Sequence, residues 1–184
     1  LTTGTKTAAA FTLDGVTLGD VTSVKEASIT IGDSGVVAEG TVDLSASNIT
    51  ATNGKIIATS DSTVKVQDAS KNSIISVPGA NVNGSNVVAG EDVGKVTVTT
   101  AEQLVNYAKV EGMKITIDWS DADTLVSDLV IGNGTSITGV DGVIRLADSG
   151  TAADVATPKI VNNGGSVNIK VDSYTGTERS FYML

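Results

Sequence analysis

The chain has 184 residues, with 21 acidic against 12 basic residues, a formal net charge of −9, and neither histidine nor cysteine. These absences exclude imidazole bases, thiol nucleophiles, disulfides and metal sites built from His or Cys, so we expect no enzyme of an ordinary kind. The acidic balance disfavours nucleic-acid binding, and no run of about 18 apolar residues predicts a membrane span. Because aromatic residues make up only 3% of the chain, small aliphatic side chains must fill the interior, which favours layered β-structure.

The opening segment combines small residues with Phe11 and Leu13. Such an arm can add a strand to the sheet edge of another subunit, which makes Phe11 and Leu13 candidate interface residues. The alternative is a frayed terminus that leads into the first strand.

Short apolar runs, most of them alternating or doubled, recur from residue 11 to residue 98, as they do in β-strands. Gly, Asn, Asp and Ser clusters between them predict turns. Between Ile29 and Ile74 these runs fall about every seven to eight residues, closer than the roughly 8–12 residues typical of a β-sandwich. Three such runs would complete one turn of a three-sided solenoid. We therefore expect a mainly β fold of solenoid type, with β-sandwich domains as the alternative.

One segment departs from this β pattern. Thr100 and Gln103 have the spacing of a capping box, and Gly112 follows where a helix would end. The sequence predicts a helix at about 100–111 and a strand at 113–119. It divides the chain into a β-rich region, 1–94, and a helix-capped region, 95–184, which could also form one continuous domain.

The helix, the KITI strand after it and the run LVIGNGTSITGVDGVIRL together resemble the start of a right-handed parallel β-helix of the pectate-lyase-like kind, over about residues 95–172. The resemblance implies a helix that caps the first coil. In that family a calcium cluster and a basic proton abstractor supply the chemistry. Arg145 is the one candidate for that base, and an isolated strand arginine more often makes a surface ion pair. The chain also supplies fewer coils than the family's enzymes need.

An acidic run places four carboxylates within about a dozen residues: Asp118, Asp121, Asp123 and Asp128. Calcium binds six to eight oxygen ligands, so structural calcium is the only ion that we expect and no other cofactor is predicted. The spacing does not match an EF-hand, and the alternative is a solvated turn.

Three sequons, at Asn48, Asn83 and Asn133, have the pattern of glycosylation acceptors, although a chain this rich in Asn, Ser and Thr gives such matches by chance. Tyr107, Trp119 and Tyr174 could stack on a carbohydrate. The alternative for Tyr107 and Trp119 is that they anchor the helix to the first coil.

The chain ends on an apolar tail that includes Phe181, Tyr182 and Leu184. Such a tail is costly to expose, so we expect it to dock on its own domain or on a neighbouring subunit.

The composition resembles that of prokaryotic surface layers, adhesins, outer domains of flagella and pili, and phage fibres. This resemblance implies a non-catalytic structural subunit at the extracellular cell surface that self-associates into an oligomer or a filament. A carbohydrate-binding or carbohydrate-processing β-helix domain, with a cell-surface glycan as its partner, is the alternative from another class. A phage virion structural protein is a third possibility with the same assembly physics.

Overall fold

A computed structural model of the chain describes residues 9–21, 26–86, 93–119, 123–146 and 158–172. It is mainly β, as the short apolar runs predict, and divides into two compact units, Leu1–Val87 and Val88–Leu184. Among the described residues, no helix has the length and apolarity needed to cross a bilayer.

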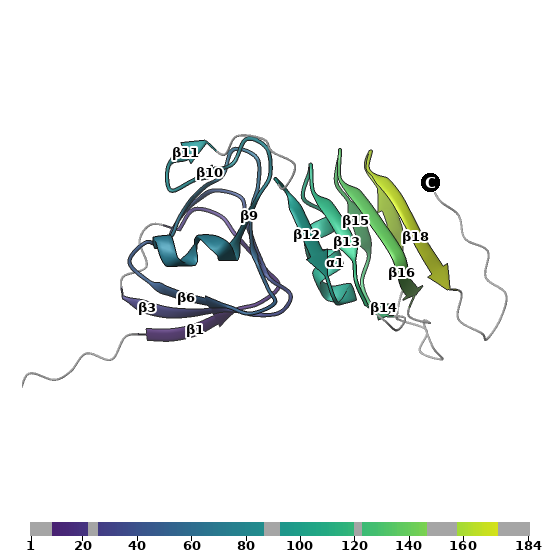
Figure 1. Cartoon of the computed structure of the whole chain (residues 1–184), viewed down its shortest axis with the longest axis horizontal. Helices are drawn as coiled ribbons and strands as arrows, with labels where there is room; N and C mark the ends of the chain where they lie inside the picture. The colour runs from purple at the N-terminus through teal and green to yellow at the C-terminus, as the bar shows by residue number, and fades with distance from the viewer. Residues whose placement is uncertain (1–8, 22–25, 87–92, 120–122, 147–157, 173–184) are drawn as a thin grey trace, which may run out of the picture. The chain divides into compact units, whose positions relative to one another are not determined.

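Short parallel strands make up most of the N-terminal unit (Figure 1). In chain order they are β1 (Ala9–Leu13), β2 (Val16–Leu18), β3 (Ala27–Ile31), β4 (Val36–Ala38), β5 (Thr41–Asp43), β6 (Asn48–Ala51), β7 (Ile56–Ala58), β8 (Thr63–Lys65), β9 (Ile74–Ser76), β10 (Asn81–Val82) and β11 (Ser85–Asn86). They form three sheets, with strand orders β1-β3-β6, β2-β4-β7-β9 and β11-β10-β8-β5. Only the β10–β11 pair of this unit is antiparallel in the described ranges.

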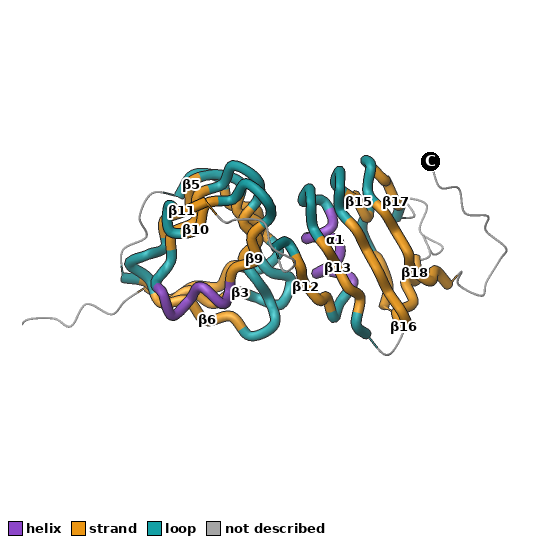
Figure 2. The backbone as a smooth tube through the Cα atoms, turned by 45° about the horizontal axis from the view of Figure 1, so that its top comes forward, coloured by secondary structure: helices purple, strands orange, loops and turns teal. Residues whose placement is uncertain are grey.

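The chain visits the three sheets in rotation. Strands β3, β4 and β5 belong to different sheets, and β6, β7 and β8 return to those sheets in the same order. Val36 pairs with Val16 on one side and with Ile56 on the other, so partners are twenty positions apart. We call each passage through the three sheets a coil. Figure 2 shows the strands of these coils arranged around a common interior.

The interior of this unit is filled by small aliphatic side chains from all three sheets. They are Ala27, Ile29, Ile31, Val36, Ala38, Val42, Leu44, Ile56, Ala58, Val64, Val66 and Ala80. In β3 the buried and exposed positions alternate, because successive side chains of a strand point to opposite faces. Val, Ile, Leu and Ala suffice for this core because each coil lies directly against the next.

Side chains and close backbone contacts join the turns of successive coils. An oxygen of Asp14 accepts a hydrogen bond from the backbone N–H of Ser34 at 2.9 Å, and Asp20 accepts one from that of Thr41 at 2.8 Å. A Cβ atom added to Gly54 would lie only 1.8 Å from the carbonyl oxygen of Gly32. The turns are therefore packed backbone against backbone, a spacing that only glycine permits there.

The last coil of this unit has two additional elements. The 3₁₀-helix η1 (Asp68–Ser73) lies against β6 and β9, and β11 pairs with β10. Both elements lie at the end of the unit opposite to β1 and β2 in the strand orders.

The C-terminal unit combines one helix with parallel strands. Its elements are β12 (Lys95–Val98), α1 (Ala101–Ala108), β13 (Lys114–Ile117), β14 (Asp123–Leu125), β15 (Leu129–Ile131), β16 (Ser136–Leu146), β17 (Ile160–Asn162) and β18 (Ser166–Asp172). Strands β12, β13, β16 and β18 pair in that order, side by side in Figure 1. The later part of β16 also pairs with β14, and β15 pairs with β17.

Helix α1 begins as the capping box predicts. The Thr100 hydroxyl accepts a hydrogen bond from the backbone N–H of Gln103 at 3.2 Å, and the Gln103 side chain accepts one from that of Thr99 at 2.8 Å. The helix ends at Ala108, before the predicted 111, because Val110 N–H bonds back to the Tyr107 carbonyl in a tighter turn. The strand after it is 114–117, within the predicted 113–119.

This helix takes the place of a strand at one end of the β15–β17 sheet. It packs against β12, β13, β14 and β15. The backbone N–H of Gly132, just after β15, donates to the carbonyl of Ala108 at 2.8 Å. This hydrogen bond joins the end of the helix to the segment that follows β15.

Candidate functional site: the outer coils of the two units

Strands β1 and β2 form the outer coil of the N-terminal unit. Within the described part of the chain, β1 pairs with β3 alone and β2 with β4 alone. Each therefore presents a row of backbone N–H and C=O groups that could pair with another strand.

The inward side chains of this outer coil are exposed where their partners are buried. Phe11 is 38% exposed, whereas Ile29, its partner in β3, is 1% exposed. Val16 is 37% exposed, whereas its partner Val36 is 0% exposed. The columns are the same, and among the described residues Phe11 and Val16 have a neighbouring strand on one side only. The predicted interface residue Leu13 lies in the same strand and is half-buried.

A second outer coil, formed by β17 and β18, lies at the end of the C-terminal unit. In the described ranges β17 pairs only with β15, and β18 only with β16. The inward residues Ile160 and Val167 are half-buried, and Val161 is 39% exposed opposite the half-buried Val130. The corresponding inner residues Leu129 and Ile137 are buried.

On one sheet of each unit, outward hydroxyl and amide side chains line up in register. In the N-terminal unit the column is Thr12, Thr30 and Thr50, and all three are exposed. In the C-terminal unit the exposed column is Thr97, Thr116, Thr138 and Asn168. The two outer coils thus end in the same kind of polar ladder.

The charges of the two outer coils differ in sign. Residues 9–21 include two carboxylates, Asp14 and Asp20, and no basic residue. Residues 158–172 include two lysines, Lys159 and Lys170, against the single carboxylate of Asp172.

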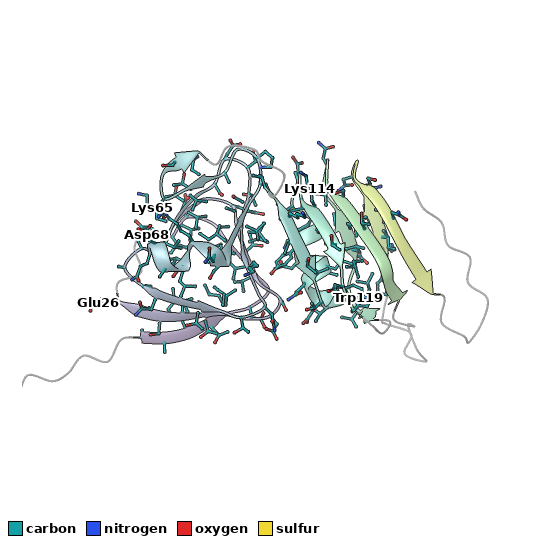
Figure 3. The ribbon with its side chains drawn as sticks, in the orientation of Figure 1. Glu26, Lys65, Asp68, Lys114 and Trp119 are labelled. Carbon is teal, nitrogen blue, oxygen red and sulfur yellow. The ribbon has the colours of Figure 1, made fainter. Side chains whose placement is uncertain are left out.

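Two carboxylates away from these coils have a lowered pKa. The hydroxyl and backbone N–H of Ser45 both donate to Asp43 and lower its pKa, with a smaller contribution from Lys65. Lys71 lowers the pKa of Asp68 through a hydrogen bond and its positive charge, in an exposed ion pair of 2.9 Å. Lys65 and Asp68 are labelled in Figure 3.

The predicted calcium ligands are partly described. Asp118 is exposed after β13, and the Asp128 carboxylate accepts the backbone N–H of Lys159 at 2.9 Å. Asp123 lies in β14 with its side chain outside the description, and Asp121 lies outside the described residues. No group of three or more acidic side chains that could hold a metal ion occurs in the described part. A calcium site at this run stays a prediction.

The asparagines of the three sequons are all exposed. Asn48 begins β6, and the Asn83 side-chain oxygen accepts the backbone N–H of Val66 at 2.9 Å. The sequon of Asn133 ends at Thr135, whose buried hydroxyl donates to the Val110 carbonyl. Glycosylation of these residues stays a prediction.

The aromatic residues of the C-terminal unit are buried where they are described. Tyr107 is 1% exposed and Trp119, labelled in Figure 3, is 9% exposed. Neither ring therefore forms an exposed stacking surface. The backbone of Arg145 pairs with Thr124 and Asp172. Outside the described residues lie the Arg145 side chain, Tyr174 and the predicted tail contacts Phe181, Tyr182 and Leu184.

Sequence reasoning missed part of the outer surface. Val16 and Val161 resemble the other apolar strand residues, and nothing in their local sequence marks them as outermost. Only the strand pairing shows that they lack a neighbour on one side. No family model, curated protein or solved structure matches the chain.

Proposed function

We propose that this chain is a non-catalytic, extracellular structural module, built as short right-handed parallel β-helices, that self-associates through its outer coils. The observation that carries the proposal is the contrast between exposed Phe11 and buried Ile29 in one column. A terminal coil with an apolar inner face and an unpaired strand edge gains free energy when another coil covers it.

The β-helix part of the proposal is supported by the rotation of the chain through three sheets. A β-sandwich is built from antiparallel strands, whereas in the described part only β10 and β11 pair in that way. Connections between parallel strands of one sheet are right-handed in nearly all proteins, which favours that hand here.

The surface chemistry supports a structural role. Exposed columns such as Thr12, Thr30 and Thr50 present one small polar group per coil. Repeated cross-strand pairs of this kind stabilise stacked sheets. The lack of His and Cys suits a protein whose task is contact between copies rather than acid–base or thiol chemistry.

The net charge of −9 affects the proposed association between copies. Like charge keeps copies apart at low ionic strength, and salt or a divalent cation reduces that repulsion. Calcium is therefore proposed as an aid to assembly, bound near the acidic run that includes Asp118 and Asp128.

Electron microscopy of the purified chain at increasing concentration, with and without calcium, tests the proposal. We expect filaments or sheets whose number rises with concentration and with calcium. Single particles at every concentration, in both conditions, would contradict self-association.

The carbohydrate-binding alternative loses support at Trp119, because its ring is buried. A virion structural protein would use the same outer coils and differ only in where assembly takes place.

A further inference from the structure

In each unit the inward side chains of one end are more exposed than those of the other end, and we call the more exposed end open. In the N-terminal unit β1 and β2 are the open end, whereas η1 and β11 lie at the other. In the C-terminal unit β12 and β18 both have an unpaired edge in the described ranges, but α1 packs against β12 and the inward Val98 is buried, whereas the inward Val167 of β18 is half-buried. Val98 in β12 is 0% exposed, in contrast to Phe11 in β1.

We infer that copies of this chain join head to tail, with β1 of one copy stacked on β18 of the next. This inference rests on the proposed function and specifies its contact. The two surfaces are different, so each copy can offer one surface to one neighbour and the second surface to another. A contact of this heterologous kind repeats into a linear filament unless the rotation closes a ring.

Strand direction allows this contact. β1 runs parallel to β3, and β18 runs parallel to β16. A parallel pair of β1 and β18 across two copies would therefore continue both ladders without reversal. This is strand addition to an exposed sheet edge, in which backbone hydrogen bonds supply affinity and side-chain columns supply specificity.

The side-chain columns set the register of the contact. In β18, Val167 continues the inward column of Ile137, and Asn168 continues the outward column of Thr138. In β1, Phe11 is the inward residue and Thr12 the outward one. The register that centres Val167 on β1 and keeps both columns places Val167 beside Phe11 and Asn168 beside Thr12.

Chemistry at the two ends favours a second copy over contact between like ends. Apolar Phe11 would meet apolar Val167. The carboxylates Asp14 and Asp20 would approach a segment that carries Lys159 and Lys170. Contact between two N-terminal outer coils would instead bring the same carboxylates together, which costs free energy.

Introduced cysteines test the register directly, because the natural chain has none. Residues opposite each other on neighbouring strands have Cβ atoms about 4.5–5.5 Å apart, close to the separation that a disulfide spans. The variants Thr12→Cys and Asn168→Cys are mixed and oxidised mildly. Thr97→Cys replaces Thr12→Cys in the matched control, because Thr97 is an exposed threonine on the outward face of β12.

We expect the Thr12→Cys and Asn168→Cys mixture to form mixed dimers on the order of a hundredfold faster than the control mixture, because assembled thiols share a high effective concentration. The double variant should form a series of disulfide-linked multimers, which a reducing agent should separate into single chains. Circular dichroism of each variant checks that the fold is kept.

Three outcomes separate this contact from the proposed function. Equal rates in the test and control mixtures, with filaments still visible in micrographs, would overturn the head-to-tail contact and leave self-association intact. Disulfides formed mainly between two Thr12→Cys chains would replace it with contact between like ends. An absence of both assemblies and cross-links would overturn the contact and the proposed function together.

Discussion

The Thr135 hydroxyl joins the turn after α1 to the next coil. It is fully buried, donates to the Val110 carbonyl at 2.5 Å and accepts the Met113 N–H at 3.2 Å. Replacing it with valine keeps the shape but leaves two buried backbone groups without this partner.

Thr135→Val should lower the free energy of unfolding by about 1–3 kcal/mol. Urea unfolding followed by the fluorescence of Trp119, the only tryptophan, reports on this unit. The matched control Thr138→Val lies on the exposed face and should change stability by less than about 0.5 kcal/mol. Equal effects of the two substitutions would mean that the buried hydrogen bonds contribute nothing.

Asp43 links stability to pH. Hydrogen bonds from Ser45 lower its folded pKa below the ordinary value of 3.8. The stabilisation is therefore present above that ordinary value and is lost as the pH falls through the lowered folded pKa. Asp43→Asn should make the loss of stability in acid shallower.

Melting temperatures measured from about pH 5 to about pH 2 test this linkage. Ser45→Ala removes the side-chain donor and should shift the acid dependence in the same direction by a smaller amount. An acid dependence identical in the natural chain and in both variants would refute the link.

For single residues, the sequence indicated which side chains could make contacts, but it did not predict which of them are buried. It identified Phe11 and Leu13 as candidate contacts because apolar residues follow a run of small ones, and Phe11 is indeed exposed. It did not single out Val16 or Val161, because exposure depends on which strands pair across twenty or more residues. Trp119 could be assigned to the core or to a carbohydrate surface until its burial was known.

At the scale of elements, the turns limit how closely coils approach. Gly54 faces the Gly32 carbonyl so closely that an added Cβ would overlap it at 1.8 Å. Gly54→Ala must push two coils apart and should cost about 1–3 kcal/mol or more.

Gly19→Ala is the control for this substitution, since nothing lies within 4 Å of an added Cβ there. It should be neutral or stabilising by up to about 1 kcal/mol, because alanine restricts the unfolded chain. Thermal unfolding followed by circular dichroism compares the two variants. Similar melting temperatures would show that the turns have room that the structure does not indicate.

The elements themselves were largely predictable, and their partners were not. Thr100 and Gln103 form a local capping pattern, so the start of α1 could be found from sequence alone. The 3₁₀-helix 68–73 and the β10–β11 pair carry no comparable local pattern. The coils repeat positions rather than residue types, since Phe11, Ile29 and Ile49 share a column. An exact sequence repeat is therefore absent.

For the whole molecule, the open ends and the net charge of −9 act in opposite directions. Apolar outer coils favour contact between copies, whereas like charge opposes it over about a Debye length, roughly 10 Å at 0.1 M salt. Assembly should therefore strengthen as salt is added. The two units each contribute one outer coil, so one chain can contact two other copies.

The molar mass in solution, measured by light scattering as concentration rises, tests assembly through the outer coils. The natural chain should grow from its 18.5 kDa monomer into larger species. Phe11→Lys places a charge on the exposed inward face of β1 and should keep the monomer mass, whereas the control Thr97→Lys adds the same charge on the outward face of β12 and should assemble like the natural chain. A natural chain that keeps the monomer mass at the highest concentrations, with and without calcium and salt, would contradict assembly through the outer coils.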